Sequence, residues 1–179
     1  GLVTGIGHIE RFNPILPEIK KIVRNPLYIE IKRHNPASAR VNSSSVVEDL
    51  MIHDVDIVRN VLLPTGDYRL TGSGNEDVCS ALFSFGETPV YLSASRKSSK
   101  KIRMIYIEEE EFTIEGDFMA QEIYIHRKPG QYAADDERYV QENIIEKVLV
   151  NKQEPLKLEL STFLDCVARK RAFPVTPEQ

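Results

Sequence analysis

One stretch of the sequence combines a histidine with polar side chains at helical spacing. Asp49 lies four residues before His53, and Asp56 and Asn60 follow at steps that place all four on one side of an α-helix. A histidine beside a carboxylate can exchange a proton with a substrate hydroxyl. Asp49 and His53 are therefore the candidate catalytic pair. The alternative is an amphipathic helix whose polar side meets water, and the spacing alone leaves both interpretations open.

A second polar segment, Gly7–Pro14, lies before the first predicted helix. With Gly5 ahead of it, the segment partly matches the G-x-G-x-x-G loop that binds dinucleotide phosphates. Glu10 occupies the position of the third glycine, and no full strand precedes the segment. The acidic residue that completes a β–α–β dinucleotide unit is also missing. The sequence therefore argues against a dinucleotide site here.

Helices and strands must position these residues. Asn13 and Pro14 predict the start of a first helix. Ser45 and Glu48 form a capping box in front of the helix that carries His53, which we expect to end near Leu62. Alternating or apolar runs predict strands over 27–34, 78–85, 90–95, 102–107, 112–114, 123–125 and 143–150. Helical spacing predicts a last helix over 155–169.

This order of elements predicts an α+β fold. We expect an open, mainly antiparallel sheet with helices packed on one face, because the strands are joined by short connections such as 86–89. The other face would be available for oligomerisation. A length of 179 residues suits a single domain.

Composition narrows the classes of protein. The net charge is −4 and charges of both signs are interleaved, which argues against nucleic acid or an anionic membrane as a partner. No apolar run is long enough to cross a bilayer, and no signal peptide is evident. Cys79 and Cys166 stand far apart without histidine-rich neighbours, so we expect reduced thiols, no metal site and a cytoplasmic protein.

Both polar segments resemble the C-terminal domain of one oxidoreductase family, that of glucose–fructose oxidoreductase, inositol dehydrogenase and the rhizopine-catabolism protein (Gfo/Idh/MocA). The segment Gly7–Pro14 resembles the connection by which the family chain enters that domain. The segment Asp49–Asp56 resembles the family's signature helix with its D-x-x-x-H core. Further matches follow in the same order within 76–86, 93–103, 112–118 and 173–179, so the resemblance covers nearly the whole chain.

The resemblance implies a role for individual residues. His53 matches the family histidine that exchanges a proton with the substrate hydroxyl while a hydride passes to or from the nicotinamide, and Asp49 matches the carboxylate that positions both. Arg11, Asn13 and Arg33 become candidate substrate-binding residues. The implied substrate is a sugar, polyol or related hydroxy compound, and the implied cofactor of the intact protein is NAD or NADP. A homodimer or homotetramer formed through the sheet is also implied.

The sequence departs from the family pattern at its beginning. The N-terminal Rossmann domain, with its glycine-rich loop and a lysine in an E-K-P-type motif, is absent from residues 1–179. We therefore expect a single C-terminal substrate-binding and oligomerisation domain from a polypeptide about twice as long. Alone, it should bind no cofactor and have no activity. The alternatives are a non-catalytic interaction or scaffold domain that keeps the fold, and a free-standing small-ligand sensor.

Overall fold

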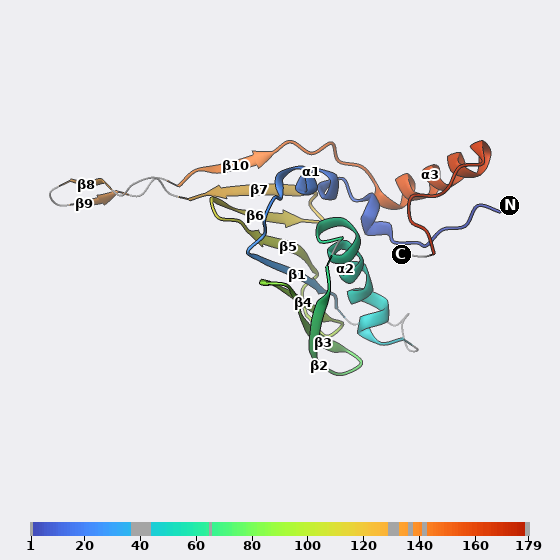
Figure 1. The fold of residues 1–179 in the computed structure, drawn as a ribbon, viewed down its shortest axis with the longest axis horizontal. Coiled ribbons are helices and arrows are strands. Elements are labelled where there is room, and N and C mark those ends of the chain that lie inside the picture. Colours follow the sequence, from blue (N-terminus) through green and yellow to red (C-terminus); the bar gives the residue numbers. More distant parts are fainter. Residues whose placement is uncertain are drawn as a thin grey trace.

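An eight-stranded open sheet forms the body of the protein. The computed structural model describes residues 2–36, 44–64, 66–128, 133–135, 138–140 and 143–177. The strand order is β10-β7-β6-β5-β1-β4-β3-β2 (Figure 1). The strands of this sheet are β1 Tyr28–His34, β2 Tyr68–Gly74, β3 Val78–Phe85, β4 Thr88–Ser95, β5 Ile102–Glu108, β6 Phe112–Asp117, β7 Glu122–Arg127 and β10 Ile145–Val148. Strands β8 (Ala133–Asp135) and β9 (Arg138–Val140) form a separate hairpin.

The predicted fold class is confirmed. Strand β1 pairs in parallel with β4, and the other described neighbours in the sheet pair antiparallel. Apolar and polar residues alternate along the central strands, as in β1, where Ile29 and Ile31 are buried between the partly exposed Glu30 and Lys32. This alternation gives the sheet one apolar face and one face of polar tips.

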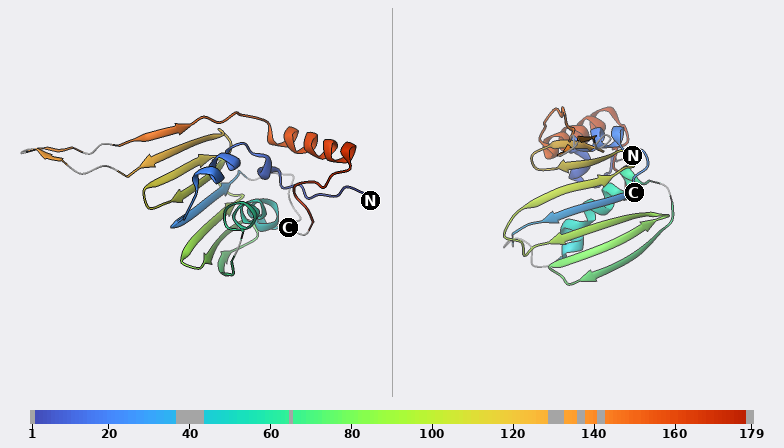
Figure 2. Two further views of the ribbon diagram at one scale, coloured as in Figure 1. Left: turned by 45° about the horizontal axis from the view of Figure 1, so that its top comes forward. Right: turned by 90° about the vertical axis from the view of Figure 1, so that its left-hand side faces the viewer.

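Two helical segments cover the apolar face (Figure 2). The first is α1, Ile15–Ile22. The second runs without a break through η2 (Val47–Met51), α2 (Ile52–Ile57) and η3 (Val58–Leu62). Its two outer parts are wound in wide π-helical turns. The predicted capping box is present, because the backbone N–H of Ser45 donates to the Glu48 carboxylate at 2.9 Å.

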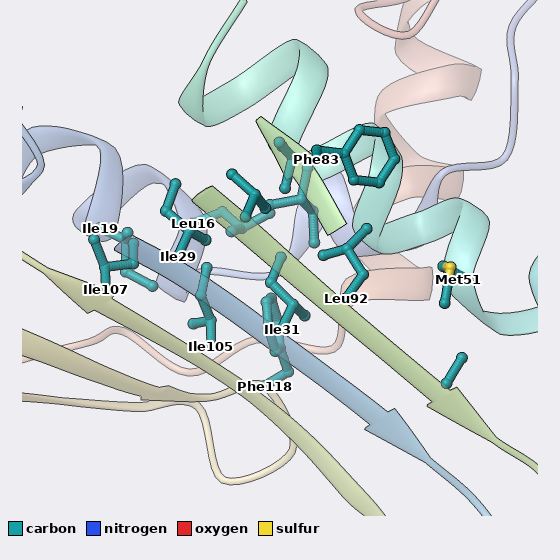
Figure 3. Close-up of a cluster of buried hydrophobic side chains, with 14 of the residues drawn as sticks. Leu16, Ile19, Ile29, Ile31, Met51, Phe83, Leu92, Ile105, Ile107 and Phe118 are labelled. Atoms are coloured by element: carbon teal, nitrogen blue, oxygen red, sulfur yellow. The ribbon is translucent and has the colours of Figure 1, made fainter. Parts of the chain in front are cut away.

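The core lies between these helices and the sheet (Figure 3). Ile19 of α1 packs above Ile105 and Gly116 of strands β5 and β6. A Cβ atom at Gly116 would lie 2.7 Å from Ile105 Cγ2 and 3.1 Å from Ile19 Cδ1. The missing side chain at Gly116 therefore lets α1 approach the strands closely.

Helix α3, Pro155–Arg169, packs on the N-terminal part of the chain. Phe173, just after this helix, stacks on Phe12 at 5.7 Å between ring centroids and meets Phe163 edge-on at 5.4 Å. The backbone N–H of Ile6 donates to the Val175 carbonyl at 3.0 Å. The N-terminal segment and α3 consequently lie at the same end of the molecule (Figure 1).

Sequence patterns missed two features of this fold. The parallel pairing of β1 with β4 was not predicted, since the order of elements favoured hairpins alone. Strand β2 was not predicted individually, because it holds two glycines and all of its residues are exposed. Among the described helices, none is long and apolar enough to cross a membrane.

Candidate active site

The short 3-10 turn η1, Ile9–Phe12, lies against α2 and brings two groups of polar side chains together. The turn closes where the backbone N–H of Asn13 donates to the Glu10 carbonyl at 3.0 Å. Its residues diverge from there. His8 and Arg11 meet one side of α2, while Glu10 and Asn13 point into the protein. Each group draws residues from both elements, so the two groups share one scaffold.

The inward group is a buried ion network. The Arg33 guanidinium donates to both oxygens of Asp54, at 2.6 to 3.1 Å, and to Glu10 at 2.7 Å. Glu10 also accepts from Arg103 at 3.3 Å and from the Asn13 amide at 3.2 Å. Arg33 and Asp54 are 1% and 0% exposed. Strand β1, helix α2 and turn η1 are therefore joined through charged groups that no water reaches.

Burial and neighbouring charges act against each other in this network, and at Asp54 burial outweighs the lowering effect of Arg33 and raises the pKa. Burial opposes the charge on Arg33, but the carboxylates of Asp54 and Glu10 outweigh it and raise the pKa of Arg33. Burial likewise opposes the charge on Glu10, but Arg33 and then Arg103 outweigh it and lower the pKa of Glu10. Removing one partner of such a buried pair strongly lowers protein stability, because the other charged group is left buried without a partner.

The outward group is a histidine cluster, made of His8, Arg11, His53, Asp56 and Asn60. Arg11 donates to both Asp56 oxygens, at 2.6 and 2.8 Å, and Asn60 donates to the same carboxylate at 2.8 Å. These hydrogen bonds overcome the effect of burial and lower the pKa of Asp56. His8 Nε2 lies 3.8 Å from Asp56 Oδ1, and the His8 ring meets the His53 ring edge-on, with 5.9 Å between centroids.

His53 has spare hydrogen-bonding capacity. Its Nδ1 atom is buried and has no hydrogen-bond partner in the described part of the chain, and the same holds for Nδ1 of His8. Burial lowers the pKa of His53, and the positive charge of Arg33 lowers it further. A half-buried, neutral imidazole with a free ring nitrogen can accept a proton from a ligand hydroxyl.

The structure brings together some of the residues that the sequence singled out. Arg11 lies in the histidine cluster with His53. Asn13 is 2% exposed, donates to the Phe118 carbonyl at 3.0 Å and accepts from the backbone N–H of Ile15 at 3.3 Å. Arg33 is held within the ion network and does not reach the surface.

Asp49 stands apart from this group. Within the described residues, no hydrogen bond or ion pair joins its side chain to His53. Asp49 is partly exposed. A role in positioning substrate therefore stays a prediction for Asp49.

Sequence reasoning missed His8, Glu10, Asp54 and Arg103 as members of the site. The buried partner of Glu10 and Asp54, Arg33, lies more than twenty residues from each, so no local spacing connects them. One signal was present. Asp54 follows His53 directly in an otherwise apolar helix, where a second carboxylate beside Asp56 needs a partner.

The segment that partly matches a dinucleotide loop, residues 5–7, does not fit phosphate groups. A Cβ atom at Gly5 would lie 2.2 Å from the Phe173 ring, and one at Gly7 would lie 3.8 Å from a Glu159 carboxylate oxygen. The two glycines therefore pack against an aromatic ring and a carboxylate, and a carboxylate repels phosphate. Nor do the described side chains place three or more His, Cys, Asp or Glu groups where they could hold a metal ion.

Comparisons with known proteins place this geometry among dehydrogenases. UDP-N-acetylglucosamine 3-dehydrogenase from Acidithiobacillus ferrooxidans is 29% identical over an alignment that covers 95% of this chain and 55% of that protein. A solved structure of that enzyme superimposes with a TM-score of 0.79 at 26% identity, over 98% of this chain and 57% of that one. The relatives are oxidoreductases. No protein-family model matches the chain.

A more distant structure shares the fold alone. A 3-ketoreductase from Actinomadura kijaniata, solved in complex with TDP-benzene and NADP, matches with a TM-score of 0.73 at 7% identity, over 96% of this chain and 55% of that one. The chain thus spans about half the length of the relatives that it matches.

Proposed function

We propose that residues 1–179 are the C-terminal, substrate-binding and oligomerisation half of an NAD(P)-dependent oxidoreductase of the Gfo/Idh/MocA family. The observation that carries the proposal is His53, half-buried on α2 edge-on to the His8 ring and with a lowered pKa. His53 lies on the helix that matches the family's D-x-x-x-H signature. The coverage of 55% of a dehydrogenase supports a longer polypeptide.

In this proposal the chain handles the proton of the reaction. A substrate hydroxyl approaches the neutral imidazole of His53, which takes the hydroxyl proton as the carbonyl forms. When bound by the other half of the polypeptide, a nicotinamide would supply the hydride acceptor. Asp49, partly exposed one turn before His53, would orient the substrate hydroxyl or the imidazolium. Arg11 would help to line the site through its fixed position on Asp56.

The substrate class that we propose is a nucleotide-linked sugar. The support comes from the activity of the relative that is 29% identical, a UDP-N-acetylglucosamine 3-dehydrogenase. A sugar hydroxyl presents the C–H and O–H pair that oxidation to a ketone requires. Polyols and other hydroxy compounds remain the wider class from which a substrate screen should start.

Oligomerisation through the free face of the sheet belongs to the same proposal. Four half-buried tyrosines stand on that face: Tyr28, Tyr91, Tyr106 and Tyr124. Side chains of this kind combine an apolar ring with a polar tip, which suits an interface between copies of a protein. We propose that a second copy packs there, giving a homodimer or homotetramer.

Turnover by the longer polypeptide that contains this chain tests the function. UDP-N-acetylglucosamine and a panel of other nucleotide sugars and polyols would be incubated with NAD or NADP, and the absorbance of the reduced cofactor followed. We expect His53→Ala to lower turnover by roughly several hundred-fold, with an unchanged melting temperature. Arg59→Ala, exposed on the same helical segment and given no role in the proposal, is the control and should keep normal turnover. Full turnover by His53→Ala would remove the catalytic assignment.

A further inference from the structure

Helix α3 has an apolar side that the described structure leaves uncovered. Leu156, Leu160, Leu164 and Val167 are 47%, 54%, 66% and 46% exposed. Their spacing of four, four and three residues places them in one row along the helix. We call this row the leucine stripe. Three leucines and a valine in one exposed row are more than the scattered apolar residues of an ordinary surface.

The covered side of α3 holds residues of a different kind from those of the exposed leucine stripe. It carries Phe163 and Cys166, which pack with Phe173, and it also carries Glu159, which is 8% exposed. A helix that packs one side only is expected to bury its leucines and expose its glutamate. Helix α3 does the reverse in this part of the chain, so its packing is incomplete.

Glu159 gives a second, independent indication. Its Oε1 atom is buried and has no hydrogen-bond partner in the part of the chain that the structure describes. Burial raises the pKa of Glu159. Buried carboxylate oxygens in folded proteins are almost always hydrogen-bonded. A donor for this oxygen is missing from the described part of the chain, which again indicates incomplete packing around α3.

We propose that the leucine stripe is covered by the half of the polypeptide that precedes Leu2, which rests on the proposed function. The N-terminal segment lies at the same end of the molecule as α3 (Figures 1 and 2). Thr4 lines a hollow together with Lys170 and Phe173, directly after the helix. Leu2 and Ile6, at the start of the chain, are themselves 95% and 41% exposed.

The length of the relatives also supports the half of the polypeptide that precedes Leu2 as the segment that covers the leucine stripe. The chain covers 55% of the dehydrogenase that it matches, so a relative of that size has a second half to accommodate. An apolar stripe and an unpartnered carboxylate, both next to the point where that half would join, give it a surface to pack on. The leucine stripe is therefore assigned to contact between the halves, and the free sheet face to contact between copies.

Thiol labelling in the longer polypeptide tests the assignment. Leu160→Cys places a thiol in the stripe, and Ser161→Cys places one at the next, exposed position, outside the stripe. We expect N-ethylmaleimide to label Leu160→Cys at least about tenfold more slowly than Ser161→Cys, at every protein concentration, because the cover belongs to the same molecule. Leu164→Cys repeats the measurement should Leu160→Cys lower the yield of folded protein.

Photo-crosslinking from Leu164→Cys identifies the segment that covers the leucine stripe. A crosslink to a peptide that precedes Leu2 supports the proposal. Equal labelling of the two thiols, protection that grows with protein concentration, or a crosslink to residues 2–177 of another copy would overturn it. Turnover separates this result from the proposed function. A polypeptide that oxidises its substrate but labels both thiols equally rejects the docking surface alone, and a protected stripe without turnover rejects the catalytic assignment alone.

Discussion

Replacing Arg33 by methionine is the most direct test of the buried ion network. The substitution keeps a long, flexible side chain but removes the guanidinium, which makes three hydrogen bonds to Asp54 and one to Glu10. Glu10 keeps Arg103 and Asn13 as donors. Asp54, which is 0% exposed, would be left without a donor among the described residues.

The expected loss in the free energy of unfolding follows from the Asp54 carboxylate, which would be buried without a hydrogen-bond donor. Breaking a buried ion pair on one side costs about 3–5 kcal/mol, a large part of the stability of an ordinary domain. Arg127→Met is the matched control, because Arg127 also donates to both oxygens of one carboxylate, that of Glu146, but both side chains are more than 40% exposed. We expect that control to lower the free energy of unfolding far less than Arg33→Met does, because solvent screens an exposed ion pair. Adding Asp54→Leu to Arg33→Met should recover most of the loss, since no unpaired charge remains.

Urea unfolding followed by circular dichroism measures these differences, and pH provides an internal check. The pKa of Glu10 is lowered in the folded state, so its stabilisation is present above its ordinary pKa and is lost as pH falls through the lowered value. The gap between the unsubstituted protein and Arg33→Met should therefore narrow below about pH 4. A cost for Arg33→Met no larger than that for Arg127→Met, at neutral pH, would refute the reasoning.

Three further predictions concern single residues. Since the pKa of His53 is lowered, a reaction that needs neutral His53 should keep its rate below the ordinary histidine pKa of about 6.5, and the acid limb of kcat/KM against pH will show this. Gly116→Ala should lower the free energy of unfolding by about 1–3 kcal/mol in urea titrations, because its Cβ would press on Ile105 and Ile19. Ser45→Ala removes the capping box and should cost about 1 kcal/mol, seen as a lower melting temperature.

Local patterns predicted the elements of the fold well. The last helix was predicted over 155–169 and is observed as Pro155–Arg169, because proline at its first position and leucines at helical spacing are local signals. Pairing between strands is not local. Strand β1 pairs with β4 through contacts some sixty residues apart, such as Ile29 with Val90, and no pattern within either strand encodes that choice.

The contacts of the candidate site also divide into local ones, which the sequence predicted, and contacts between distant residues, which it did not. Helical spacing connected Asp56 with Asn60, which are hydrogen-bonded at 2.8 Å across one turn. The contact of Arg11 with Asp56 depends on how η1 lies against α2, and it joins residues 45 positions apart. The burial of Arg33 was also beyond a local pattern, since an arginine at a strand end is usually exposed.

The buried ion network and the histidine cluster act on each other through helix α2. His53 and Asp54 are neighbours in sequence, so they point to different sides of the helix. Three hydrogen bonds from Arg33 on β1 hold Asp54 in place, which fixes the rotation of α2 and thereby the direction of His53. The same guanidinium is close enough to lower the pKa of His53. Arg33 can therefore determine both the direction of the His53 side chain and how readily His53 stays neutral.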